Sequence, residues 1–356
     1  MANAFINRIA TAVPPHDVHA AFLGFARTML AGDNRRVSIF DRLVQRSGIA
    51  HRHSVLAPAA NSGQTVDAKG FYRLGHFPGT AARMQLFEEC APPLAVQAVE
   101  KLLKGEDRSR ITHLIVTSCT GLSAPGIDLA LVAQCGLRPD MERSFLGFMG
   151  CYAAINALKL ARHIVRSEPD ARVVLVNAEL CTIHLQETDN LEEILSFLLF
   201  ADGCAATLVS ADPQGVAMDS FHAALVPDTG DLIRWHIREQ GFDMLLSGAV
   251  PAAIETALAH AQGDILSARS PRDIALWAVH PGGRTVLDAV EKAFTLAPEA
   301  LAASRAILNQ YGNMSSPSVM FVLERLMREA VPGAPGCAMA FGPGLVAETM
   351  QFHMMS

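Results

Sequence analysis

The feature that most constrains the fold is a series of short, wholly apolar runs separated by segments with helical spacing. The runs are 113–118 (HLIVTS), 173–176 (VVLV), 205–210 (AATLVS), 274–279 (IALWAV) and 338–341 (AMAF). Between them, apolar residues recur every three or four positions, most clearly in 152–166, 285–294 and 316–329. Strands that are buried on both faces and alternate with helices predict an α/β fold.

The chain of 356 residues is long enough for two or three domains, or for one internally duplicated fold. Half of the residues are hydrophobic and only 18% are charged, which predicts a large core and excludes disorder. Composition changes nowhere abruptly. We therefore place a soft division at the turn 212–215 (DPQG), which separates residues 1–212 from residues 213–356.

Several broad classes have little support. The net charge is −6 and no Lys/Arg stripe is present, so nucleic-acid binding is not expected. The N-terminal residues MANAFINRIATAVPP do not form a signal peptide pattern, and the most apolar stretch, 194–209, is too interrupted to span a membrane. The seven cysteines are far apart and lack C-x-x-C spacing, which predicts a reducing, cytoplasmic location without disulfides or a zinc site.

Cys151 is the first candidate catalytic residue. It lies in SFLGFMGCYAAINALKLAR, where a short apolar run ends at Gly150 and a helical pattern begins immediately afterwards. The positive end of a helix dipole lowers the pKa of a thiol, and Gly150 allows a tight turn beside it. The alternative is an unreactive core cysteine, because free cysteines are among the most buried residues.

Two polar residues and a glycine-rich turn complete the candidate constellation. His280 directly follows the run IALWAV and precedes a Pro-Gly-Gly turn, where open α/β sheets place site residues. Asn313 precedes a predicted helix, and its amide could polarise a thioester carbonyl or merely cap that helix. The turn formed by Gly342, Pro343 and Gly344 could bring backbone amides to a reacting carbonyl. Taken alone, His280 is equally well explained as a turn cap, and the glycines as a tight turn.

The blocks around these residues resemble the chalcone synthase-like, type III polyketide synthases. GCYAAI, WAVHPGG, YGNMSS and FGPGL have the order and spacing of that family, and ITHLIVTSCTG, LLFADGCAA and WHIREQGFDMLLSGAVP agree. The resemblance covers nearly the whole chain. It implies a homodimer with a duplicated thiolase fold of αβαβα layers, with Cys151 in the first half and His280 and Asn313 in the second.

The resemblance also implies an activity. The Cys151 thiolate would attack an acyl-CoA starter, and protonated His280 would stabilise that thiolate as an ion pair. His280 and Asn313 would then donate hydrogen bonds to the thioester oxygen of malonyl-CoA as it loses CO2, and the carbanion would attack acyl-Cys151. Repeated extension would end in cyclisation to an alkylpyrone or to a resorcinol or phloroglucinol. No cofactor is implied, because the CoA thioesters are substrates.

Further roles come from the same resemblance. Phe200 and Met244 match gatekeeper positions. The positions that shape the cavity match Thr182, Trp235, Ser315 and Cys119. Met244 and Trp235 depart from the plant pattern, which carries an aromatic residue and a glycine there. The W-x5-G-F pattern resembles instead the bacterial alkylpyrone and alkylresorcinol synthases, which implies a fatty acyl starter. Plain core packing is the alternative for both residues.

Three arginines are candidate contacts for the CoA phosphates. Arg42 and Arg46 match basic positions of the family, and their i, i+4 spacing places them on one helix face. Arg284 follows the Gly-Gly turn and is a further candidate. The alternative is a solvated basic face.

Other functions remain open at this point. A ketoacyl-ACP synthase III has the same fold and triad but performs one condensation. A hydroxymethylglutaryl-CoA synthase would need a general-acid Glu that we cannot assign. A serine hydrolase is disfavoured because GLSAPG has Pro125 where G-x-S-x-G requires glycine. A non-catalytic binding protein on a thiolase scaffold is disfavoured by the intact triad.

Overall fold

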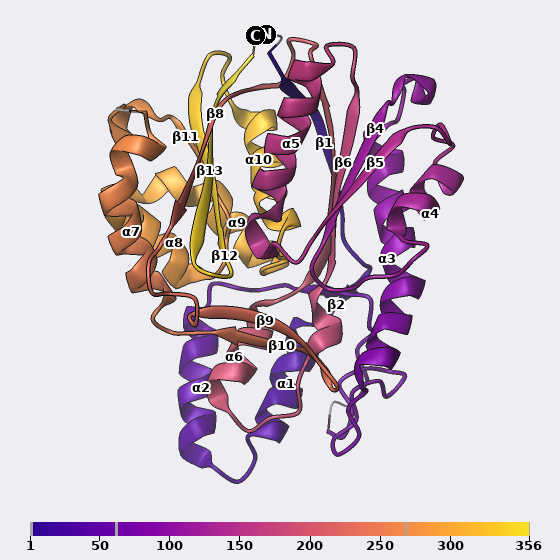
Figure 1. Cartoon of the computed structure of the whole chain (residues 1–356). Coiled ribbons are helices and arrows are strands. Elements are labelled where there is room, and N and C mark those ends of the chain that lie inside the picture. Colours follow the sequence, from indigo (N-terminus) through magenta and orange to yellow (C-terminus); the bar gives the residue numbers. More distant parts are fainter. Residues whose placement is uncertain (1–2, 61–62, 268, 356) are drawn as a thin grey trace.

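The computed structural model describes residues 3–60, 63–267 and 269–355. Its centre is one nine-stranded mixed sheet in the order β11-β12-β13-β8-β1-β7-β6-β4-β5 (Figure 1). The strands are β1 (Phe5–Ala12), β4 (His113–Ser118), β5 (Glu142–Gly147), β6 (Val173–Leu180), β7 (Asp202–Ser210), β8 (Val216–Leu225), β11 (Leu276–Val279), β12 (Pro335–Gly342) and β13 (Val346–Met354). The sheet is continuous because β1 pairs with both β7 and β8.

The sheet contains the same four-strand pattern twice. In β4-β6-β7-β1 the first pair is parallel and the next two pairs are antiparallel. The series β11-β12-β13-β8 repeats this order of parallel and antiparallel pairs. The predicted duplication is therefore confirmed. It makes β4 equivalent to β11, so Cys119 and His280, which directly follow these strands, occupy equivalent positions.

Helices cover both parts of the sheet and lie between them (Figure 1). Between the two parts lie α5 (Ala153–Ser167) and α10 (Pro317–Glu329), which share one core with both sets of strands. One outer layer is α3 (Thr80–Leu102) with α4 (Ile127–Gln134). The other outer layer is α7 (Val250–Ile265) with α8 (Arg284–Ala293), beside α9 (Ala302–Tyr311). These are the αβαβα layers that were predicted.

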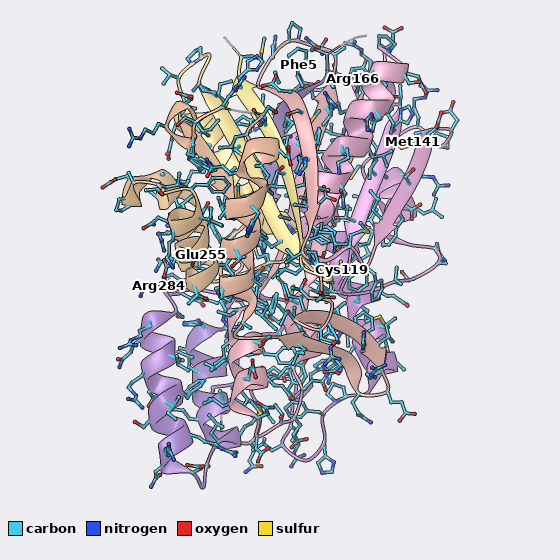
Figure 2. All side chains as sticks on the ribbon, turned by 60° about the vertical axis from the view of Figure 1, so that its left-hand side comes forward. Phe5, Cys119, Met141, Arg166, Glu255 and Arg284 are labelled. Atoms are coloured by element: carbon cyan, nitrogen blue, oxygen red, sulfur yellow. The ribbon has the colours of Figure 1, made fainter. Side chains whose placement is uncertain are left out.

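A smaller cap covers one end of the sheet, below it in Figure 1. It consists of α1 (His19–Met29), α2 (Asn34–Arg46), α6 (Leu191–Leu199), the pair β2 (His16–Asp17) with β3 (His53–Ser54), and the hairpin β9 (Ile233–Arg238) with β10 (Gly241–Leu246). The helices α1 and α6 have a core of their own. In Figure 2, Cys119 marks the boundary between sheet and cap, far from Phe5 and Arg166. The cap therefore covers the end of the sheet at which β4 and β11 terminate.

The local predictions agree well with these elements. The run 113–118 is β4, and the segments 152–166, 285–294 and 316–329 coincide with α5, α8 and α10 to within one residue at each end. The sequence did not predict β1, β5, β8 or β13. β5 lies at the edge of the sheet and is largely exposed, so it lacks an apolar run. Within the described residues, no helix combines the length and apolarity needed to cross a membrane.

Candidate active site

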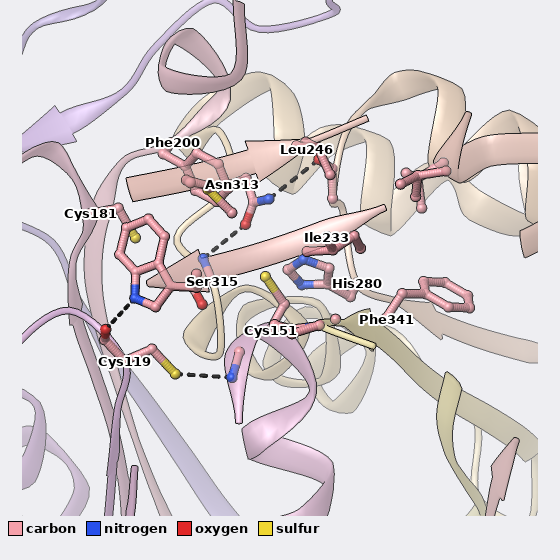
Figure 3. A pocket seen from close by; sticks show the side chains of 18 of the residues that line it. Cys119, Cys151, Cys181, Phe200, Ile233, Leu246, His280, Asn313, Ser315 and Phe341 are labelled. Carbon is pink, nitrogen blue, oxygen red and sulfur yellow. Dashed lines mark hydrogen bonds between the residues drawn. The ribbon is translucent and has the colours of Figure 1, made fainter. Parts of the chain in front are cut away.

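A small apolar cavity of about 60 Å³ lies where the sheet meets the cap (Figure 3). Cys151, His280 and Asn313 all line it, although they come from three separate parts of the chain. Cys151 lies in the short 3-10 helix Gly150–Tyr152 that leads into α5, and His280 directly follows β11. Asn313 lies between α9 and α10. The fold therefore brings together the three residues that the sequence singled out.

The turn before Cys151 can only be formed by glycine. Gly150 has φ +71°, and a Cβ there would lie 2.3 Å from Cδ of Pro343. The backbone N–H of Gly150 donates to Sγ of Cys119 at 3.0 Å. The turn that carries the nucleophile candidate is thus packed directly between the glycine-rich turn and Cys119.

The imidazole of His280 is buried and lacks hydrogen-bond partners among the described residues. Its backbone N–H donates to Met339 O at 2.8 Å and so extends the parallel pairing of β11 with β12. The side chain is 1% exposed, and neither ring nitrogen has a hydrogen-bond partner among the described residues. Buried polar groups normally have partners. An imidazole with two free nitrogens in an apolar cavity is therefore available to a substrate.

Asn313 is held by its backbone and by its amide. Its N–H donates to Leu199 O at 2.8 Å, and its carbonyl accepts from the N–H of Ala201 at 2.9 Å. Oδ1 accepts from the N–H of Ser315 at 2.8 Å, while Nδ2 donates to Gly282 O at 3.3 Å. These bonds fix the amide orientation and leave one N–H of Nδ2 for the cavity. The N-cap residue of α10 is Ser316, so Asn313 is not the helix cap.

The protonation of the pair differs from the sequence-based expectation. Burial raises the pKa of Cys151 to about 12, and the nearby polar side chains of Ser315 and Asn313 act in the opposite direction. Burial lowers the pKa of His280 to about 3. Desolvation therefore outweighs the helix dipole on which the sequence argument relied. Both shifts therefore favour the neutral form of each group, which is the opposite direction from the one the helix dipole predicts.

Several other predicted residues complete the wall. Phe200, Met244, Trp235, Ser315 and Cys119 line the cavity, as do Gly342 and Pro343. Trp235 and Met244 are directly paired across the hairpin of β9 and β10. The indole N–H of Trp235 donates to Cys119 O at 2.7 Å and fixes the indole at the cavity (Figure 3).

Comparison with known proteins identifies the family. The family pattern described as the chalcone and stilbene synthases, N-terminal domain, matches residues 2–213, and the pattern for their C-terminal domain matches residues 217–356. The chain belongs to the chalcone and stilbene synthase family. It is thus a type III polyketide synthase and an acyltransferase.

Individual members are similar over most or all of the chain. The α-pyrone synthesis polyketide synthase-like Pks18 of Mycobacterium tuberculosis is 32% identical over 99% of this chain and 91% of its own. Bisdemethoxycurcumin synthase of Oryza sativa is 33% identical over 89% of this chain and 83% of its own. The crystal structure of 1,3,6,8-tetrahydroxynaphthalene synthase from Streptomyces coelicolor has a TM-score of 0.89 at 27% identity, covering 99% of both chains.

Two predicted positions of this polyketide synthase do not line the cavity. The hydroxyl of Thr182 donates to Oδ2 of Asp202 at 2.7 Å and lies 2.7 Å from Oγ of Ser54, which holds it outside the wall. Its neighbour Cys181 lines the cavity instead. Gly344, with φ +76°, forms the tight turn before β13, and only Gly342 and Pro343 of that segment reach the cavity.

A larger cavity of about 1120 Å³ adjoins the small one and shares Leu246, Val250, Gly282 and Val286 with it. Arg46 and Arg284 line this entrance, and Arg284 donates from Nη1 to Arg46 O at 3.2 Å. Arg42 lies on α2 as predicted but does not line the entrance. Its Nε donates to Ser38 O one turn earlier in α2, whereas the residues at the end of this helix line the entrance.

The sequence reasoning missed Glu179, a fully buried carboxylate behind the cavity. Glu179 accepts from the N–H of Cys119 at 2.9 Å, from Oγ1 of Thr120 at 2.8 Å and from Oγ of Ser316 at 2.8 Å. Burial raises its pKa to about 7. It joins the end of β4 to the start of α10. The detectable signal was an acidic residue inside the apolar strand VVLVNAEL.

One group of side chains in the described part of the chain has the geometry to hold a metal ion. It consists of His113, Glu142 and Glu168, and both carboxylates are exposed. His113 and Glu142 begin β4 and β5, so the group lies at the opposite end of these strands from Cys119 and the cavity. It has no contact with the candidate active site.

Proposed function

We propose that this enzyme loads a short aliphatic acyl group onto Cys151 and extends it with malonyl-CoA in repeated decarboxylative condensations. The observation that carries the proposal is the convergence of Cys151, His280 and Asn313 on one buried apolar cavity. The adjoining entrance, with Arg46 and Arg284, suits a coenzyme that carries phosphates. The acyl thioester would enter from that side.

In the first step, we expect Cys151 and His280 to start from their neutral forms. As Sγ of Cys151 attacks the thioester carbonyl, its proton passes to His280, which then donates it to the departing CoA sulfur. Because burial raises the pKa of this thiol, we propose that proton transfer to His280 accompanies the attack. The products of this step are acyl-Cys151 and free CoA.

Extension uses His280 and Asn313 as hydrogen-bond donors. The thioester oxygen of malonyl-CoA would accept from Nε2 or Nδ1 of His280 and from the free N–H of Asn313. Loss of CO2 leaves negative charge on that oxygen, where fixed donors in an apolar cavity stabilise it best. The resulting carbanion attacks the carbonyl of acyl-Cys151, releases the thiolate and forms a new carbon–carbon bond. None of these steps needs a metal or redox cofactor, so activity should survive EDTA.

The cavity volume favours a short starter. The cavity at the three catalytic candidates has a volume of about 60 Å³ and is much smaller than the adjoining cavity of about 1120 Å³. This supports an acyl group of similar size rather than the fatty acyl starter that the W-x5-G-F pattern implies. The wall includes Phe197, Ile233 and Leu246, which favours an aliphatic chain. We propose an α-pyrone product, by analogy with the named role of Pks18.

We also propose that the enzyme is a homodimer. β5 is a terminal strand of the sheet, and Phe145 on it is 44% exposed. Leu122 and Leu129 nearby are 44% and 42% exposed. Exposed edges and apolar patches of this kind mark association surfaces. Light scattering should give twice the mass of the chain, and Leu129→Glu should shift it toward the monomer.

The deciding experiment incubates the purified enzyme with labelled malonyl-CoA and acetyl-, hexanoyl-, lauroyl- or coumaroyl-CoA, with Cys151→Ala as the control. We expect pyrones with more than one extension, best from acetyl- or hexanoyl-CoA and absent with the variant. A single β-ketoacyl product made only from malonyl-ACP would contradict the proposal and indicate a ketoacyl-ACP synthase III activity.

A further inference from the structure

Arg52 is a completely buried arginine that no step of the proposed mechanism uses. Its side chain is 0% exposed. Nη1 donates to Phe200 O at 2.7 Å and to Phe197 O at 3.3 Å, and Nε donates to Nδ1 of His19 at 3.0 Å. Nη2 has no partner in the described part of the chain. A buried cation that bonds mainly to backbone carbonyls is costly to retain, so its position calls for an explanation.

The guanidinium keeps its charge in this setting. Burial lowers the pKa of Arg52 to about 10, while the charges of Asp202 and Asp17 act in the opposite direction. Arg52 is therefore protonated at neutral pH, and its Nη1 donates to two carbonyls at the C-terminal end of α6. The planar guanidinium bonds His19 through Nε and the carbonyls through Nη1 at the same time, and a lysine ammonium cannot reproduce this geometry, so lysine is not an equivalent residue here.

The carbonyls that Arg52 holds lead directly to Asn313. Phe200 lines the cavity, and its backbone forms a parallel bridge with Asn313. This bridge consists of the two bonds from Asn313 to Leu199 and from Ala201 to Asn313.

Gly312, directly before Asn313, packs on the same guanidinium stem. A Cβ at Gly312 would lie 2.8 Å from Cγ of Arg52 and 2.8 Å from Leu199 O. Arg52 thus lies against both chain segments of the bridge that sets the position of Asn313. Figure 3 shows the Phe200 and Asn313 side chains together at the same side of the cavity.

We propose that Arg52 is a positioning residue for decarboxylation: it holds the Phe200–Asn313 bridge so that the free N–H of Asn313 meets the thioester oxygen. This inference rests on the proposed function. Capping of α6 alone would not require a buried cation, because water or an exposed side chain satisfies most helix ends. The rigid guanidinium instead fixes the backbone of Phe200, and through the bridge the position of Asn313. A shift of about 1 Å in a catalytic group costs on the order of 10²-fold in rate.

The test measures CO2 release from malonyl-CoA by Arg52→Lys, with kcat and KM determined separately. We expect kcat to fall about 10²-fold, within the range for loss of one oxyanion donor, with KM within threefold of wild type. Alkylation of Cys151 by iodoacetamide should keep its rate. Arg52→Lys should cost little more when added to Asn313→Ala, because both remove the same contact.

Arg83 provides the matched control. It is also 0% exposed, and its Nη1 donates to Ile183 O and Leu185 O at 2.7 and 2.9 Å, but it does not contact the bridge. Arg83→Lys should lower the thermal midpoint by a similar amount without the selective loss of kcat. If Arg52→Lys does not fold, Gly312→Ala disturbs the same bridge without removing the charge, and we expect the same loss of kcat.

Three outcomes would overturn the inference. The first is an unchanged kcat in Arg52→Lys, and the second is an equal fall in kcat and in the Cys151 alkylation rate. The third is full additivity with Asn313→Ala. Failure of wild-type enzyme to decarboxylate malonyl-CoA would instead refute the proposed function, so the two failures are distinguishable.

Discussion

Gly150→Ala is the substitution whose consequences the structure defines most closely. Gly150 has φ +71°, which costs an L-residue about 1–2 kcal/mol. The new Cβ would lie 2.3 Å from Cδ of Pro343. Because carbon atoms at optimal separation are about 3.5–4.0 Å apart, the two must separate by about 1.2 Å to reach that range. The chain can do this only by moving either the turn of Cys151 or the loop of Pro343.

Either movement displaces groups that line the cavity. We expect kcat for the condensation to fall on the order of 10²-fold, the cost of a misplacement of about 1 Å. We also expect the free energy of unfolding to fall by about 2–5 kcal/mol, as the sum of backbone strain and overpacking. The assays are product formation from labelled malonyl-CoA and unfolding in urea.

Gly105→Ala is the matched control, because Gly105 has φ +83° and a Cβ there would meet nothing within 4 Å. It should lose only the strain energy, about 1–2 kcal/mol, and keep full activity. The steric argument is refuted if Gly150→Ala retains wild-type kcat, or if both variants lose the same stability and the same activity.

Three further predictions concern the wall, the entrance and the response to pH. Trp235→Ala should raise the ratio of kcat/KM for lauroyl-CoA over hexanoyl-CoA at least about tenfold, because the indole closes the cavity; an unchanged ratio would show that another residue limits length. Arg46→Ala should raise KM for CoA thioesters about three- to tenfold without changing kcat, and an equal effect on thioesters that lack the phosphates would contradict phosphate binding. Burial lowers the pKa of His184 from 6.5 to about 3. As the pH falls below 6.5, His184 therefore becomes protonated in the unfolded chain while it stays neutral in the folded enzyme. Wild type should therefore lose about 1.4 kcal/mol per pH unit relative to His184→Gln in urea unfolding between pH 6 and 4; parallel pH profiles would refute this assignment.

Much of the local structure could be predicted from the sequence. The buried strand β4 and the helices α5, α8 and α10 follow from hydrophobic periodicity, because buried elements must present apolar residues at the spacing of their own geometry. The catalytic candidates were found through their positions at element ends: Cys151 before a helix, His280 after a strand and Asn313 before a helix. Each signal was weak alone, and the combination in the order of a known family made them specific.

Hydrophobic periodicity did not predict the exposed and irregular strands. β5 has one edge unpaired within the described structure and much of its surface exposed, so no apolar run marks it. The hairpin of β9 and β10 lies in the cap and pairs Trp235 with Met244, but nothing in their spacing states which face meets the cavity. The wrong prediction that Thr182 lines the cavity has the same cause: neighbouring side chains point in different directions, and Cys181 lines the cavity instead.

The sequence by itself determined that the chain forms buried α/β elements and that a cysteine, a histidine and an asparagine stand at their ends, because composition and periodicity are local properties. Only the tertiary structure decided what those residues experience. Burial raises the pKa of Cys151 and lowers that of His280. The residues around them leave a cavity of about 60 Å³. Arg52 donates to the backbone of Phe200, which forms a bridge with Asn313. Desolvation, volume and long-range contact depend on segments that are distant in the chain, and no local pattern records them.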